Sequence, residues 1–82
     1  MNNVVTYRTE NNELITVELL IEFRIERIGK SYVAYTINDD GISENVNVFI
    51  SEIDYSGDIP KVIPIKEDEA AMVLAFYDSI KL

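Results

Sequence analysis

The chain has 82 residues, of which 48% are hydrophobic and 27% charged, and its 15 acidic and 7 basic residues give a formal net charge of −8. Residues 1–82 are therefore expected to form a single folded domain with one hydrophobic core, rather than a disordered segment. The negative charge repels phosphate backbones and anionic lipid, so direct nucleic-acid binding and membrane binding are disfavoured. The simpler interpretation of this charge is solubility, and the alternative is a surface complementary to a basic partner protein.

Neither a disulfide nor a targeting segment is expected. The sequence has no cysteine, which suits a reducing compartment. The start of the chain has no basic region, and the most apolar stretch, residues 14–23, is interrupted by Thr16, Glu18 and Glu22. This pattern is not typical of a signal peptide or of a membrane-spanning helix.

A long strand is predicted over residues 15–25, because every odd position there is apolar. The odd residues are Ile15, Val17, Leu19, Ile21, Phe23 and Ile25. A preceding loop of residues 10–12, with Asn12 in the left-handed conformation, would place Tyr7 opposite Ile15 and Val5 opposite Val17. These strands would share one apolar face.

The next hairpin is expected to turn at residues 27–29, with Gly29 in the left-handed conformation. A three-residue loop there would set Phe23 opposite Val33 and Ile21 opposite Tyr35. The loop chemistry and the alternation of apolar residues over 31–37 are both consistent with this register.

The second half of the chain predicts further strands and then a helix. Apolar alternation over 46–50 indicates a strand that ends or bulges near Ser51, and residues 61–65 form a short edge strand beside Pro60 and Pro64. A helix over 69–81, capped by Asp68, should place its apolar stripe on the inner face of the sheet. The stripe consists of Val73, Phe76, Tyr77 and Ile80. The predicted fold is α+β, an antiparallel β-meander of four or five strands with one C-terminal α-helix packed on one face.

The composition argues against enzyme chemistry. The chain has no histidine and no cysteine, so the commonest general base, the thiol nucleophile and zinc sites of nitrogen and sulfur ligands are excluded. The acidic turn at residues 38–41 does not match a calcium loop, because Thr36 and Asn47 would occupy the first and twelfth ligand positions. We therefore predict no catalytic residue, no metal site and no cofactor.

A candidate interface for a protein partner remains after the core is assigned. The predicted register places several apolar residues on the outer face of the sheet, with three acidic residues around them. The apolar residues are Leu20, Tyr32, Ala34 and Phe49, and the acidic rim is Glu18, Glu22 and Glu26. A covering loop or an insignificant scatter of surface residues is the alternative interpretation.

A non-enzymatic protein-binding or regulatory module is the function that these observations favour. Three alternatives stay open. The same patch could mediate a homodimer, the acidic rim could mimic nucleic acid, and a small-ligand-binding domain would need an apolar pocket that one helix on one sheet seldom leaves.

Four segments of the sequence resemble the YrzB-like domain of unknown function. They are residues 20–26, 29–33, 46–49 and 62–69, followed by the apolar positions of the predicted helix, and together they extend over nearly the whole chain. The family consists of small acidic proteins of Gram-positive bacteria with no assigned activity. The resemblance implies a bacterial cytoplasmic protein and carries over no site residue.

Overall fold

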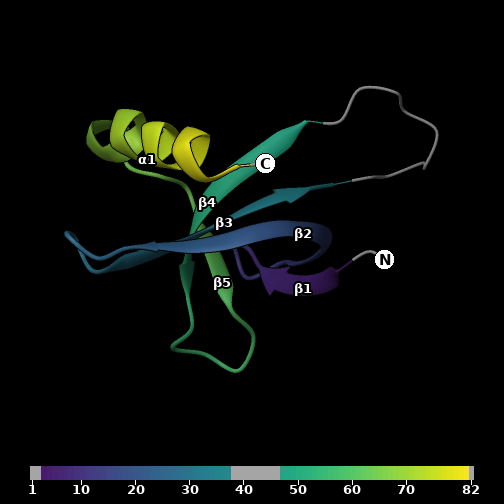
Figure 1. The fold of residues 1–82 in the computed structure, drawn as a ribbon. Helices are drawn as coiled ribbons and strands as arrows, with labels where there is room; N and C mark the ends of the chain where they lie inside the picture. The colour runs from purple at the N-terminus through teal and green to yellow at the C-terminus, as the bar shows by residue number, and fades with distance from the viewer. Residues whose placement is uncertain (1–2, 38–46, 82) are drawn as a thin grey trace.

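The computed structural model describes residues 3–37 and 47–81, and this part of the chain forms five strands and one helix. The elements are β1 (Val4–Arg8), β2 (Leu14–Ile25), β3 (Lys30–Thr36), β4 (Val48–Asp54), β5 (Lys61–Ile63) and α1 (Glu67–Ile80). Figure 1 shows α1 lying across one side of the strands, with the β2–β3 hairpin extending along it. The predicted α+β composition is confirmed, and the predicted turn at residues 38–41 lies outside the described residues.

The first hairpin has the predicted register. Tyr7 pairs with Ile15 and Val5 with Val17, and Asn12 adopts a φ of 66° in the connecting turn. Asparagine tolerates this left-handed conformation because its short polar side chain can bond to the nearby backbone. The loop residue and the alternation of apolar side chains therefore determine this register together.

The second hairpin differs from the predicted register. Gly29 has the expected left-handed φ of 67°, but the turn has four residues, 26–29, and Phe23 pairs with Tyr32 instead of Val33. Further along, the pairing shifts between Leu19 and Ile21, which leaves Leu20 as the extra residue of a β-bulge. The extra residue shifts the alternation of the strand by one, so every later side chain points to the opposite side of the sheet from the one that regular alternation would give.

The bulge divides the apolar stripe of β2 between two cores. Before Leu20, Val17 and Leu19 point into the space enclosed by the strands, whereas beyond it Phe23 and Ile25 point outward to α1. The first core consists of Tyr7, Val17, Val33, Tyr35, Ile53 and Val62, and the second of Phe23, Ile25, Tyr32 and Val73.

The strands close into a barrel in the order β1-β2-β3-β4-β5. The predicted meander left its first and last strands unpaired with each other, and this part of the prediction is wrong. β1 and β5 are parallel, with Arg8 paired to Lys61, and the backbone N–H of Arg8 donates to the carbonyl oxygen of Pro60 at 2.9 Å. β4 continues without interruption past Ser51, where a bulge or strand end was predicted, and its last three residues pair with β5.

Helix α1 covers the outside of the barrel rather than the predicted inner face. Val73 is fully buried, and the ring of Phe76 stacks on that of Phe23 at 5.5 Å between centroids. Residues of the predicted inner face, Val17, Leu19, Val33 and Tyr35, lie instead in the barrel core, away from α1. The helix also begins earlier than predicted, at Glu67, and its N-cap residue Lys66 makes no side-chain hydrogen bond, so Asp68 is not the cap.

Strand β3 is buried on both faces as a result. Val33 and Tyr35 face the barrel interior, where the Tyr35 hydroxyl group is 2.9 Å from the Ser51 hydroxyl group, while Tyr32 and Ala34 face outward. Five consecutive residues, 32–36, are buried. A strand packed on both faces has a continuous run of apolar residues in its sequence. Residues 32–35 of β3 form such a run.

Candidate functional site

The predicted interface does not form as one surface. Tyr32 and Ala34 have no exposed surface, because the shifted register and the position of α1 place them beneath the helix layer. These two residues are therefore removed from the candidate interface. Tyr32 instead packs in the second core, where its ring stacks on Phe23 at 5.7 Å.

Leu20 and Phe49 are exposed as predicted, but they lie on different sides of the sheet. Phe49 is opposite Tyr35 and stacks on its ring at 5.9 Å, on the side of the barrel interior. Leu20 lines a hollow of about 260 Å³ with Ile21, Tyr77, Ile80 and Lys81, beside the end of α1. One partner surface cannot contact both residues in the way that the sequence predicted.

The three acidic residues of the predicted rim are also separated. Glu18 is opposite Thr36, whereas Glu22, beyond the bulge, is opposite Val33 and so faces the other side of the sheet. Glu22 accepts a hydrogen bond from the Tyr55 hydroxyl group. Glu26 lies in the hairpin turn and pairs with Arg24 at 3.3 Å. The bulge at Leu20 therefore breaks the predicted acidic row.

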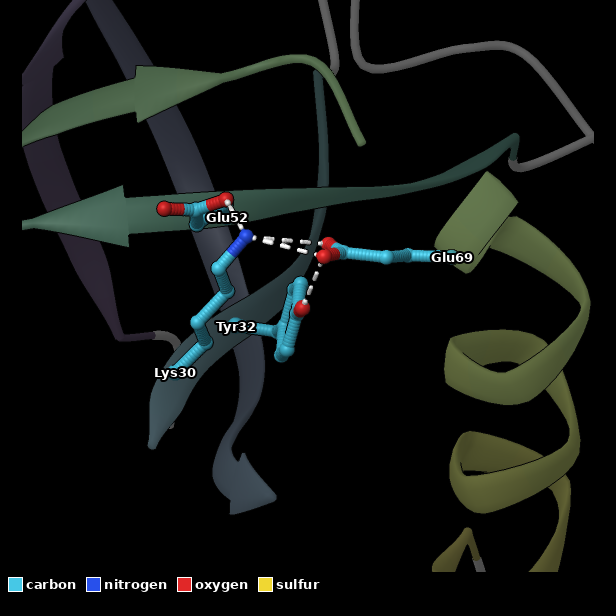
Figure 2. Close-up of polar contacts among 4 residues, drawn as sticks. All are labelled: Lys30, Tyr32, Glu52 and Glu69. Carbon is cyan, nitrogen blue, oxygen red and sulfur yellow. Dashed lines mark hydrogen bonds and ion pairs between the residues drawn. The ribbon is translucent and has the colours of Figure 1, made fainter. Parts of the chain in front are cut away.

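A polar cluster connects the start of α1 to the sheet, as Figure 2 shows. The Lys30 ammonium group donates to both carboxylate oxygens of Glu69, at 2.9 and 3.2 Å, and lies 3.7 Å from the carboxylate of Glu52. The Tyr32 hydroxyl group donates to Glu69 at 3.3 Å. β3, β4 and α1 each contribute to this cluster, so it fixes where the helix begins on the sheet.

The charged and polar groups of this cluster bind one another and hold α1 on the sheet. The hydrogen bond to Glu69 raises the pKa of Lys30, and the same bond lowers the pKa of Glu69. Burial is the main cause that raises the pKa of Tyr32. The lysine thus stays an ammonium ion and the tyrosine a phenol at neutral pH, and neither state is the nucleophile that covalent catalysis needs.

A second polar hollow lies where the barrel closes. It has a volume of about 290 Å³ and is lined by Arg8, Asn12, Asp54, Ser56, Gly57, Asp58, Ile59 and Lys61. The Arg8 guanidinium group already donates to the Asn12 carbonyl oxygen at 3.0 Å, and the Asp54 carboxylate accepts the Ser56 N–H at 2.9 Å. The Arg8 and Asp54 side chains thus each have a hydrogen-bond partner within the fold.

The largest of these hollows lies between α1 and the β2–β3 hairpin. This hairpin groove has a volume of about 440 Å³, is open to solvent, and is mainly apolar. Its lining residues are Ile25, Glu26, Arg27, Met72, Ala75 and Phe76. The Arg27 guanidinium group contacts the Met72 sulfur at 3.1 Å, which fixes one wall of the groove.

The outer face of α1 continues this groove. Residues 70–77 are apolar without interruption, yet Val73 is the one residue of the helix that is buried. Leu74 is 50% exposed, and Ala71 and Ala75 are also exposed. Ala75 belongs both to this outer face and to the hairpin groove, so the two form one continuous apolar surface.

This surface was missed from the sequence, although its signal is present there. A helix that packs on one layer shows an apolar stripe with polar residues opposite, and a helix that is apolar all round is covered on more than one side. The uninterrupted run at 70–77 is of the second kind. The sequence interpretation used only the four stripe positions that contact the sheet.

Two absences hold for the described part of the chain. Within residues 3–37 and 47–81, no group of three or more acidic side chains converges in a way that could hold a metal ion. Among the same residues, no helix combines the length and the apolar character needed to cross a membrane.

Comparisons of the chain with models of protein families, with curated proteins and with solved structures found no match. The resemblance to the YrzB-like domain therefore stays a prediction, and the function must be argued from the surface itself.

Proposed function

We propose that this protein is a non-enzymatic module that binds a partner protein through the outer face of α1 and the adjoining hairpin groove. The observation that carries this proposal is the helix that is apolar all round over residues 70–77 but is covered by its own fold on one side. Leaving Leu74 half-exposed beside an apolar groove costs free energy in water. A partner that covers this surface recovers that free energy.

The polar groups of the molecule support a binding role rather than a catalytic one. Lys30 and Glu69 bind each other, and Tyr55 donates to Glu22, so these groups are engaged within the fold. Burial and the Glu22 carboxylate raise the pKa of Tyr55, which keeps it protonated at neutral pH. Each of these groups stabilises the arrangement of the strands and helix.

The alternative of a nucleic-acid mimic is less well supported. Such a mimic needs carboxylates in a row at spacings like those of backbone phosphates, and here Glu18 and Glu22 face opposite sides of the sheet. A small-ligand site is also less well supported, because small-ligand pockets enclose most of the ligand and the hairpin groove is open.

Affinity capture from a lysate of the cell in which the protein occurs tests the proposal. The parent is compared with Leu74→Glu, which places a charge on the outer face of α1. The matched control is Leu14→Glu, because Leu14 is similarly exposed, 57% against 50%, but pairs with Arg8 at the start of β2 and does not belong to the core that α1 joins.

The expected result is one specific partner that the parent and Leu14→Glu retain and that Leu74→Glu loses, with unchanged circular dichroism for all three proteins. If Leu74→Glu retains every partner of the parent, the outer face of α1 is not the binding surface and the proposal is wrong.

A further inference from the structure

We infer that the segment of the partner that occupies the hairpin groove is an amphipathic α-helix with basic residues beside its apolar stripe. This inference rests on the proposed function and names the class of its partner. Three features of the surface favour such a helix: the backbone groups of the groove, the size of the side chains along α1, and the charges at its rim.

The walls of the groove leave a partner few backbone groups to pair with. On one side is α1, whose backbone groups bond within the helix. On the other is the hairpin turn, where the N–H groups of Ile28 and Gly29 already donate to the carbonyl oxygen of Ile25. A helix satisfies its own backbone and can bury apolar side chains in such a groove, whereas an extended peptide would leave its backbone unpaired.

The side chains along α1 permit another helix to approach closely. Ala71 and Ala75 are one helical turn apart, on the same side of α1, and both are exposed. Small residues at this spacing allow packed helices to lie about 8 to 10 Å apart. Leu74 and Met72 lie beside the two alanines, and they provide larger apolar contacts for the incoming side chains.

The rim of this surface is acidic. Glu67 and Asp68 are exposed in the first turn of α1. Asp78 in its last turn pairs with Lys81 at 3.2 Å, and Glu26 at the hairpin pairs with Arg24 at 3.3 Å, so Glu67 and Asp68 contribute most of the negative charge of the rim. Arg27 is the one basic residue that lines the groove. Basic residues on the partner helix complement this rim, and they raise the rate of association with a chain whose net charge is −8.

The same charges disfavour a second copy packed in parallel as the occupant. If α1 packed on α1 of another copy in parallel, the carboxylates of Glu67 and Asp68 in the two copies would approach each other. Like charges that face each other across an interface cost free energy. In the antiparallel direction they would approach the end of α1 where Lys81 pairs with Asp78 at 3.2 Å, so the repulsion applies to the parallel arrangement. Self-association is an outcome of the test that contradicts the inference.

Binding of designed peptides to the full chain tests the inference. The probe is a fluorescent peptide of about 18 leucine and lysine residues at helical spacing, long enough to form a helix on binding. A peptide with the same residues in shuffled order has the same charge without the apolar stripe. A third peptide has glutamate in place of lysine.

Three variants locate the binding site. Met72→Gln keeps the length of the side chain but removes an apolar contact from the groove. Glu26→Lys with Asp68→Lys reverses the charge of the rim. Glu10→Lys with Glu13→Lys changes the net charge equally at the turn of the first hairpin, far from the groove, and is the matched control.

The inference predicts that the leucine-lysine peptide binds, becomes helical, and binds about tenfold more weakly to the Glu26→Lys/Asp68→Lys variant and to Met72→Gln. The Glu10→Lys/Glu13→Lys variant should bind it within about twofold of the parent. The shuffled and glutamate peptides should not bind.

Several results would overturn the inference. Equal binding of the shuffled peptide, or equal weakening in the two double-lysine variants, would mean that only net charge attracts the peptide. A parent that sediments as a dimer, and that becomes a monomer in Leu74→Glu, would assign the surface to a second copy. If no peptide binds but Leu74→Glu still loses a cellular partner, the inference fails while the proposed function stands.

Discussion

At the scale of single residues, the Lys30 ammonium group is the centre of the contact between α1 and the sheet. It lies between the carboxylates of Glu52 and Glu69, and all three side chains are partly shielded from solvent. An isolated surface ion pair adds little stability, but a shared cation between two strands and a helix restricts the position of the helix start. Because α1 lacks a side-chain N-cap, this cluster is the side-chain contact that anchors its first turn to the sheet.

The stability of the protein should fall in acid partly through this cluster. The pKa of Glu69 is lowered, mainly by its hydrogen bond with Lys30. A carboxylate with a lower pKa in the folded state contributes stability that is fully present above its unfolded pKa, about 4.3, and lost as the pH falls through the folded value. The pKa of Asp54 is lowered as well, by the backbone N–H of Ser56, so it acts in the same direction.

We therefore expect Glu69→Gln to be less stable than the parent at about pH 6 and to approach the stability of the parent below about pH 3. Urea unfolding over a pH series measures the difference. Glu67→Gln is the control, because Glu67 is exposed in the same helical turn and the described residues give it no ion pair. A difference between Glu69→Gln and the parent that does not change with pH would contradict the linkage.

At the scale of elements, the docking of α1 depends on aromatic contacts. Phe23 stacks on Phe76 and lies 6.3 Å from the ring of Tyr77, and Val73 fills the space beside them. Aromatic pairs at these separations add to the stability that burial alone gives. Phe76 lies on the opposite side of α1 from Leu74, because residues two positions apart in a helix are about 200° apart.

Phe76→Ala should lower the free energy of unfolding by about 3 kcal/mol, the low end of the range for buried phenylalanine, because Phe76 is half-buried. Leu74→Ala should change it by less than about 0.5 kcal/mol, since Leu74 faces solvent. Urea denaturation of both variants checks this. Equal losses would mean that the two sides of α1 are buried alike.

The bulge at Leu20 makes a separate prediction. Leu20→Ala should cost less than about 1 kcal/mol, because its side chain is 45% exposed. Insertion of one alanine between Ile21 and Glu22 should abolish the native fold, because it would turn Phe23 and Ile25 away from α1. Deletion of Leu20 should leave both residues facing α1, because the pairs Leu19–Tyr35 and Ile21–Ala34 would then be consecutive. Near-ultraviolet circular dichroism distinguishes the variants, and an insertion variant with native spectra would contradict this role of the register.

The sequence predicts the parts of the fold that depend on local patterns. Asn12 and Gly29 are in the expected left-handed conformation because few residue types adopt it readily. The bulge at Leu20 could not be predicted, because the odd positions of β2 stay apolar whichever core they enter. Tyr32 and Ala34 face outward as the alternation predicts, and Tyr32 is buried because α1 covers that face.

The side of the sheet that α1 covers could not be predicted either. The pattern of β3 shows apolar residues on both faces, but it does not show whether a helix or another strand covers each face. Closure of the barrel depends on strand curvature, which the bulge changes and the local sequence does not report. The candidate surface was only partly foreseen, because its apolar run at 70–77 was interpreted as a single stripe.

At the scale of the whole molecule, the two cores are not independent. β2 contributes Val17 to the barrel core and Phe23 to the helix core, and β3 contributes Val33 and Tyr32 in the same way. Loss of either core exposes residues of strands that form the other. This arrangement should make unfolding cooperative in spite of the division of the apolar residues.

Thermal unfolding should therefore be a single two-state transition. Far-ultraviolet circular dichroism, which reports α1 and the strands, should coincide with tyrosine fluorescence, which reports both cores through Tyr7, Tyr32 and Tyr35. Calorimetry should give equal calorimetric and van't Hoff enthalpies. Two separated transitions would show that α1 detaches from a barrel that stays folded.

The parallel contact between β1 and β5 has a consequence for the order of events during folding. Every other strand pair joins neighbours in the sequence, whereas Arg8 and Lys61 are separated by most of the chain. Long loops close at a higher entropic cost than hairpins, so the barrel should close after the β1–β4 meander has formed. In stopped-flow experiments, Val62→Ala in β5 should mainly accelerate unfolding, and Val33→Ala in β3 should mainly slow folding. A Val62→Ala variant that folds as slowly as Val33→Ala would instead mean that the ring closes at the rate-limiting step.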